Sequence, residues 1–169
     1  MSANGVETFA NYAAAQLPDY GNVRALLDNV TSYYDWNELS NNGYFDDLLW
    51  WCLASIRGYE QWGDKTMLAL AETIFADVQQ KSWDTTVCGG GFWWSYMLDY
   101  KNAITNSLAI VAASKLHVLL ENGNRSAPYG VIADKALSWF LASGMLDLFA
   151  MIREASRGWD GSEPLRRLG

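Results

Sequence analysis

Two adjacent carboxylates stand directly before two adjacent indoles in residues 44–51, which read YFDDLLWW. In a close carboxyl pair, the charge on one group raises the pKa of the other, so that a proton stays available near neutral pH. Asp46 and Asp47 could therefore divide acid and base roles between them. A structural interpretation also exists, because Asp in the first turn of a helix accepts backbone N–H groups and complements the helix dipole.

A second chemical stretch lies about forty residues further on, where residues 88–95 read CGGGFWWS. Three consecutive glycines allow positive φ angles and a close approach of the backbone to its neighbours. The stretch is not a phosphate loop, because the Gly-Lys-Ser/Thr ending is missing. Exposed Phe92, Trp93 and Trp94 would be costly, so we expect them to be covered by the core or used by a ligand.

Two amides and a histidine complete the candidate polar residues. Asn102 and Asn106 lie four residues apart near the start of a predicted helix and share a face, either as local caps or as amides facing a polar ligand. His117 has no acid or cysteine at a suitable spacing, so we interpret it as structural. Two cysteines, Cys52 and Cys88, permit one disulfide but with a single histidine make a zinc site improbable. We expect no metal and no cofactor.

The elements that must position these residues are helices. Apolar periodicity predicts them at residues 7–17, 22–34, 46–61, 65–80, 101–121 and 131–141, with helical character again at 146–155. Gly63-Asp64 is expected to end one helix and cap the next, while 35–43 and 81–100 are expected to be loops. One apolar stripe runs through Met67, Leu70, Ala71, Ile74, Phe75 and Val78, and another through Ile104, Leu108, Val111, Ala112, Leu116 and Leu119. The fold class is therefore all-α.

Composition fits one domain rich in aromatic residues. The chain has 169 residues, of which half are hydrophobic and 18% are charged, and a net charge of -7. The acidic balance argues against a nucleic-acid partner, and no apolar run is long enough for a membrane span. The first residues have neither a basic nor an apolar region, so we expect no signal peptide. Residues 1–158 are expected to form the domain, and 159–169 an irregular basic tail.

Taken together, these motifs resemble glycoside hydrolase family 76, the endo-α-1,6-mannanases and their fungal cell-wall relatives. The resemblance rests on the YFDD and WW of residues 44–51, on Gly63-Asp64, on the CGGGFWW of residues 88–94 and on the YKNAITN of residues 100–106. It covers about residues 40–145. The family fold is an (α/α)6 barrel, and the number of helices predicted here corresponds to about half of that toroid.

The resemblance implies roles for individual residues. Asp46 would be the nucleophile and Asp47 the general acid/base of a retaining glycosidase, although the spacing of adjacent residues does not exclude the wider inverting geometry. Substrate-binding residues would be Tyr44, Trp93, Trp94, Asn102 and Asn106. The expected partner is mannan or a mannose-containing oligosaccharide, with a secreted or cell-wall location and self-association through a face left open by missing helices. The alternative is an inactive truncated relative that binds carbohydrate or serves as a structural helical domain.

Overall fold

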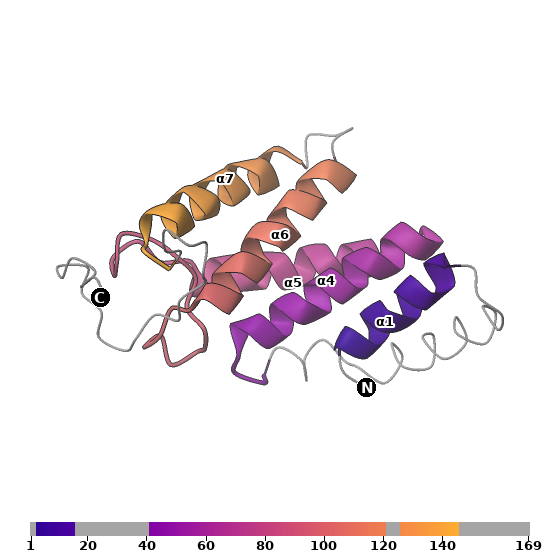
Figure 1. Cartoon of the computed structure of the whole chain (residues 1–169), viewed down its shortest axis with the longest axis horizontal. Helices are drawn as coiled ribbons and strands as arrows, with labels where there is room; N and C mark the ends of the chain where they lie inside the picture. The colour runs from indigo at the N-terminus through magenta and orange to yellow at the C-terminus, as the bar shows by residue number, and fades with distance from the viewer. Residues whose placement is uncertain (1–2, 16–40, 121–125, 146–169) are drawn as a thin grey trace, which may run out of the picture.

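The computed structural model describes residues 3–15, 41–120 and 126–145, which form five α-helices (Figure 1). Their bounds are Ala3–Ala14 for α1, Phe45–Trp62 for α4, Lys65–Ser82 for α5, Ala103–Leu119 for α6 and Ala127–Ala142 for α7. Within the described residues there is no strand, and only two isolated β-bridges occur. The all-α prediction is confirmed.

The predicted helix bounds agree best for the three central helices, each of which begins and ends within two residues of its prediction. The first helix starts at Ala3 instead of residue 7 and ends at Ala14 instead of residue 17. The last starts at Ala127 instead of residue 131, because Pro128 lies in its first turn, where proline is tolerated. The predicted helices at 22–34 and 146–155 and the basic tail lie outside the described residues.

The turn between α4 and α5 forms as predicted. Gly63 adopts the left-handed conformation at φ 67°, and its N–H donates to the carbonyl of Tyr59. Asp64 then caps α5, where its side chain accepts the N–H of Thr66 at 2.9 Å. Because only these two residues join the helices, α4 and α5 form an antiparallel hairpin.

Helix α4 lies at the centre of the described structure. It packs against α1, α5 and α6, while α7 packs against α6 and forms a second hairpin with it (Figure 1). The main core is apolar and draws on α4, α5, α6, α7 and the loop before α6; its largest fully buried members are Phe45, Leu48, Leu49, Ile56, Ile74, Phe75, Val78, Phe92 and Leu116. This packing fixes the N-terminal end of α4, where the acid pair lies.

The buried face of α6 differs from the predicted stripe. Leu108, Ala112 and Leu116 are buried as predicted, but Ile104 and Val111 are exposed, and Ala109 and Ala113 are buried as well. Helix α6 is apolar on nearly every side, so periodicity could not separate its faces. Its small alanines face the neighbouring helices, which lets the helices approach closely.

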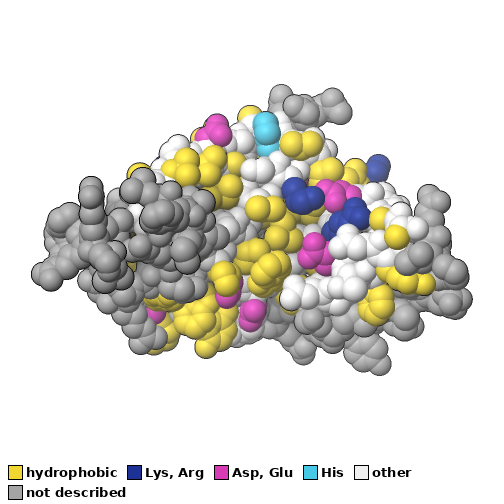
Figure 2. All heavy atoms as spheres, in the orientation of Figure 1, with side chains coloured by type: hydrophobic (Ala, Val, Ile, Leu, Met, Phe, Trp, Pro, Cys, Tyr) yellow, Lys and Arg dark blue, Asp and Glu magenta, His cyan; other side chains and the backbone are white. Residues whose placement is uncertain are grey.

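Charged side chains are mixed on the surface. Figure 2 shows one face, on which Lys and Arg lie singly or beside Asp and Glu and form no continuous basic patch in the described part of the chain. Glu60 contributes to this mixing, because it pairs with Arg57 at 3.4 Å and with Lys115 on α6 at 2.7 Å. No described helix is long and apolar enough to cross a membrane.

Candidate active site

The acid pair lies in the first turn of α4, but it does not cap the helix. The N-cap residue is Tyr44, whose side chain makes no capping bond. The first free N–H, that of Phe45, instead donates to the main-chain carbonyl of Trp94 at 2.8 Å. The loop before α6 therefore closes this helix end, and only Asp46 of the pair accepts a first-turn N–H, through one of its two oxygens.

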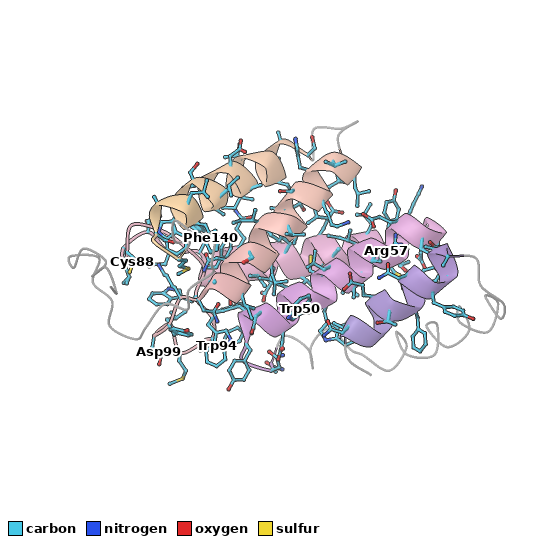
Figure 3. The ribbon with its side chains drawn as sticks, in the orientation of Figure 1. Trp50, Arg57, Cys88, Trp94, Asp99 and Phe140 are labelled. Carbon is cyan, nitrogen blue, oxygen red and sulfur yellow. The ribbon has the colours of Figure 1, made fainter. Side chains whose placement is uncertain are left out.

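Asp46 is partly buried, and both of its carboxylate oxygens accept hydrogen bonds. One accepts the N–H of Asp47 at 3.0 Å, and the other accepts the indole N–H of Trp94 at 2.9 Å. Figure 3 places Trp94 at the N-terminal end of α4. A hydrogen bond to a carboxylate is stronger than one between neutral groups, so it fixes the orientation of this side chain.

Asp47 has a different environment. The residue is exposed, and its carboxylate accepts one hydrogen bond, from the side-chain amide of Asn42 at 3.2 Å. Partial desolvation of the carboxyl and, secondarily, the neighbouring charge of Asp46 raise the pKa of Asp47 above its ordinary value. The two adjacent carboxyls therefore have different environments: Asp46 accepts an indole N–H, and Asp47 keeps its proton to a higher pH than an ordinary aspartate.

An aromatic wall stands beside the pair. The rings of Tyr44 and Trp94 pack at a centroid distance of 4.9 Å and a tilt of 48°. Tyr100 packs edge-on against Trp94 at a centroid distance of 5.9 Å. Tyr44 remains 42% exposed and Trp94 is partly buried, so both can offer ring surface next to the carboxylates.

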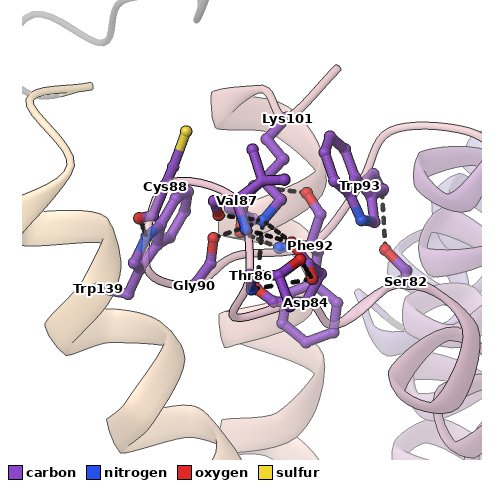
Figure 4. Close-up of polar contacts among 11 residues, drawn as sticks. Ser82, Asp84, Thr86, Val87, Cys88, Gly90, Phe92, Trp93, Lys101 and Trp139 are labelled. Carbon is purple, nitrogen blue, oxygen red and sulfur yellow. Dashed lines mark hydrogen bonds and ion pairs between the residues drawn. The ribbon is translucent and has the colours of Figure 1, made fainter. Parts of the chain in front are cut away.

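The three glycines of the loop have the backbone role that the sequence predicts. Gly89 and Gly91 have φ angles of 69° and 99°, in the region that favours glycine. Gly90 and Gly91 lie against the indole of Trp139 on α7, so closely that a Cβ at either position would come within 2.5 Å of it. The Trp139 indole N–H also donates to the carbonyl of Cys88 at 2.8 Å, which ties the loop to α7 (Figure 4).

Trp93 is placed differently from the expectation that it stacks on a substrate. Its side chain is buried in the main core, and the ammonium of Lys101 lies 4.4 Å from its ring centroid. Its main chain exchanges hydrogen bonds with Ser82, at 3.0 Å to the Ser82 carbonyl and at 2.8 Å from the Ser82 hydroxyl. Trp93 therefore has no exposed ring face on which a sugar could stack.

The two amides also point into the fold. Asn102 is the N-cap of α6, where its side chain accepts the N–H of Thr105 at 2.9 Å. Asn106 is fully buried; its oxygen accepts the N–H of Phe92 at 2.8 Å, and its amide donates to the carbonyls of Phe92 at 3.1 Å and Asn102 at 2.7 Å. Local capping, one of the two alternatives left open by the sequence, describes Asn102, whereas Asn106 binds the loop before α6 through Phe92. The structure does not bring Asn106 to a surface that a substrate could reach.

Lys101 is a residue that sequence reasoning missed. It is 5% exposed, and its ammonium donates to Asp84 and to main-chain carbonyls of the loop (Figure 4). Burial by itself raises the pKa of Asp84, but hydrogen bonds from Lys101, Thr86 and Val87 outweigh it and hold that pKa well below its usual range. Its place between Tyr100 and Asn102, in the YKNAITN motif, was the only available signal.

The remaining candidates are structural in the described residues. No disulfide joins Cys52 to Cys88; the Cys52 thiol donates to the carbonyl of Ala71 at 3.4 Å, and burial raises its pKa. The Nδ1 of His117 lies 3.0 Å from the carbonyl of Ser126. Across the described residues, no three His, Cys, Asp or Glu side chains gather as a metal site would require.

The chain matches a known protein family and several solved structures. The profile of glycosyl hydrolase family 76 matches residues 9–154. No curated protein matches the chain. An α-1,6-mannanase, GH76A from Salegentibacter sp. HEL1_6, is similar in structure, with 23% identity and a TM-score of 0.67 over 86% of this chain and 41% of that one.

Two further solved structures share the fold. One is an inactive variant of the Salegentibacter enzyme, with two consecutive aspartates changed to asparagine, in complex with α-1,6-mannotriose; it has 21% identity and a TM-score of 0.64 over 81% of this chain and 39% of that one. The other is a family 76 glycoside hydrolase from a bovine Bacteroides thetaiotaomicron strain, with 19% identity and a TM-score of 0.71 over 92% of this chain and 38% of that one.

These likenesses confirm the predicted helical fold. The chain spans about two fifths of the length of the matched structures, at 41%, 39% and 38%, which agrees with the prediction of a partial toroid. The predicted link with fungal cell walls has no support from them, since both source organisms are bacteria.

Proposed function

The chain belongs to glycosyl hydrolase family 76, and on that premise we propose that it cleaves α-1,6-linked mannan with Asp46 and Asp47 as its catalytic pair. The observation that carries the proposal is the unequal environment of two adjacent carboxyls. Asp46 receives the indole N–H of Trp94 at 2.9 Å, while the pKa of Asp47 is raised. A glycosidase needs this division between an ionised carboxylate and a carboxylic acid.

The choice of residues has independent support from the sequence. Asp46-Asp47 is the only pair of consecutive aspartates in the chain. The mannotriose complex of the Salegentibacter enzyme was obtained with an inactive variant that lacks two consecutive aspartates. The same type of pair in this chain lies at an exposed helix end beside ring surface, where a saccharide could reach it.

In the first step, ionised Asp46 attacks the anomeric carbon and forms a glycosyl–enzyme ester. The bond from that carbon to the leaving oxygen breaks at the same time, and Asp47 gives its proton to the leaving oxygen. The raised pKa of Asp47 favours this proton more than in an ordinary aspartate, which suits the acid role. The bond from Trp94 orients Asp46 and stabilises its charge before the attack.

In the second step, Asp47 is ionised and takes a proton from a water molecule, whose oxygen attacks the anomeric carbon. The ester bond to Asp46 breaks, and Asp46 leaves as a carboxylate. Both carboxyls return to their starting states. Two displacements at one carbon retain its configuration, so the product should form as the α-anomer.

Sugar rings would lie against the exposed faces of Tyr44 and Trp94, because aromatic faces pack well on the apolar C–H faces of a pyranose. In this role the two rings replace the predicted platform at Trp93, which is buried.

We further propose an extracellular or cell-surface location, on the basis of family membership. We also propose self-association through exposed apolar side chains of α6 and α7, among them Val118 at 63% and Val131 at 68%.

The test is hydrolysis of α-1,6-mannotetraose by the purified chain, followed by chromatography. Asp46→Asn and Asp47→Asn should each abolish product formation, while helical circular dichroism stays unchanged. Asp99→Asn is the matched control, because Asp99 is an exposed aspartate on the same loop as Trp94. Equal turnover by Asp46→Asn and the control would overturn the catalytic assignment.

A second candidate function is mannan binding without catalysis. The observation that favours it is that the chain covers only 41% of the length of the similar mannanase. Isothermal titration with mannotetraose separates the two functions. Binding without turnover, kept in Asp47→Asn and lost in Trp94→Ala, would support the binding role and reject hydrolysis by this chain.

A further inference from the structure

Lys101 is the only buried lysine among the described residues, and its ammonium group lies inside the loop before α6. It donates to the Asp84 carboxylate at 2.8 Å and to the carbonyls of Gly90 at 2.7 Å, Val87 at 2.8 Å and Asp84 at 3.2 Å. An ammonium group has three protons to donate. These contacts therefore use its full capacity on one stretch of chain.

Two indoles cover the same ammonium group. Its nitrogen lies 4.4 Å from the ring centroid of Trp93 and 6.0 Å from that of Trp139. Trp139 belongs to α7, so the lysine also connects the loop to the second hairpin. Such cation–π contacts strengthen when the cation is removed from water, as it is here at 5% exposure.

The loop held by Lys101 leads directly to Trp94. Gly90, which Lys101 binds, lies four residues before Trp94, and Tyr100, the residue before Lys101, accepts the main-chain N–H of Trp94 at 2.8 Å. Lys101 thus holds the segment that leads to Trp94, and it directly follows the residue whose carbonyl binds the Trp94 N–H. The Trp94 carbonyl in turn accepts the N–H of Phe45 at 2.8 Å.

We propose that Lys101 is a positioning residue for the acid pair: by fixing the loop it sets the indole of Trp94 against the carboxylate of Asp46. This role rests on the proposed function of the pair, although the contact between Trp94 and Asp46 can be measured without any substrate. Lys101 itself does not touch the pair. Its effect passes through a hydrogen bond of 2.9 Å, and such bonds weaken steeply when their geometry changes.

The experiment compares Lys101→Met with Lys115→Met in the full chain. Methionine keeps much of the volume of lysine but removes the ammonium group. Lys115→Met is the matched control, because Lys115 forms a lysine–carboxylate pair of 2.7 Å with Glu60, away from the loop. The readout is the indole ¹H–¹⁵N resonance of Trp94, assigned by its disappearance in Trp94→Phe. Asp46→Ala gives the position of this resonance when the acceptor is missing.

Lys101→Met should move the Trp94 resonance at least halfway to its position in Asp46→Ala, whereas Lys115→Met should leave it unchanged. With mannotetraose, Lys101→Met should lower kcat by about 10- to 100-fold, as expected for a misplaced reacting group, with KM within about threefold. A folded Lys101→Met whose Trp94 resonance stays in place would overturn the proposal. A wild type without turnover would reject the proposed function, and the resonance would still decide the role of Lys101.

A second variant covers the case in which Lys101→Met does not fold. Asp84→Asn keeps the side-chain volume but removes the charge that pairs with Lys101 and one of the two acceptor oxygens. It should move the Trp94 resonance in the same direction by a smaller amount. No movement in Asp84→Asn would count against the proposal.

Discussion

Asn106→Ala should destabilise the fold more than any other asparagine substitution among the described residues. The Asn106 side chain is fully buried, and it joins α6 to the loop before it by binding both the N–H and the carbonyl of Phe92. Phe92 is fully buried as well, so water cannot replace the amide. The loop would lose the brace that holds it two residues before Trp94.

The magnitude follows from counting the groups left without a partner. Removing the amide leaves the N–H and the carbonyl of Phe92 unpaired, and each unpaired buried group costs about 1–3 kcal/mol. The third partner, the Asn102 carbonyl, adds little, because the carbonyl of an N-cap residue also accepts an N–H from the first turn. The expected loss is about 2–6 kcal/mol, which is a large part of the about 5–15 kcal/mol typical of a domain.

The assay is urea unfolding followed by circular dichroism at 222 nm. Asn11→Ala is the matched control, because Asn11 is exposed and its side chain accepts one bond, from Arg57 at 2.7 Å. The control should change the free energy of unfolding by no more than about 0.5 kcal/mol. A loss below about 1 kcal/mol in Asn106→Ala would refute the reasoning, because buried unpaired groups cost more than that.

Three further predictions concern the same loop. Because the pKa of Asp84 is held well below its usual range, the carboxylate stabilises the fold fully above about pH 4 and loses this effect gradually as pH falls towards the lowered pKa. The urea midpoints of wild type and Asp84→Asn should therefore differ most at pH 7, and the gap should narrow below about pH 4 without closing at pH 3; a gap that stays constant from pH 7 to pH 3 would contradict this. Gly91→Ala should lower the free energy of unfolding by about 2 kcal/mol or more, because the new Cβ would lie 2.4 Å from the Trp139 ring and φ is 99° there. Gly89→Ala should cost less, because its Cβ would meet nothing within 4 Å, and equal shifts in melting temperature would argue against the clash. Leu98→Asn should stabilise the fold by about 1 kcal/mol, because an exposed leucine at φ 52° is strained there and asparagine tolerates it; a lower melting temperature would reject this.

Local sequence signals were sufficient for the hairpin that carries the acid pair. Helix α5 has one apolar stripe that period 3.6 identifies, and Gly63-Asp64 is a strong stop and cap because glycine favours positive φ and aspartate accepts a first-turn N–H. The adjacency of Asp46 and Asp47 is covalent, so their place together in one turn needed no tertiary information. The three consecutive glycines likewise predicted positive φ angles and a close approach of the backbone to its neighbours.

The directions of side chains in the loop could not be predicted in this way. Whether Trp93 faces solvent or the core depends on how residues 83–102 fold back on α5 and α6, which is decided by contacts distant in sequence. The bond between Trp94 and Asp46 spans 48 positions. Asn106 reads as a surface amide at helical spacing until Phe92 is placed beside it, and Lys101 reads as a solvated charge until three loop carbonyls converge on it.

The most direct measurement is the stereochemistry of cleavage. Proton NMR would follow the anomeric signals while the chain hydrolyses α-1,6-mannotetraose, with Asp46→Asn as the comparison. The proposed double displacement through Asp46 predicts that the α-anomer forms first, and that neither anomer forms with Asp46→Asn. First appearance of the β-anomer, or undiminished hydrolysis by Asp46→Asn, would contradict the account.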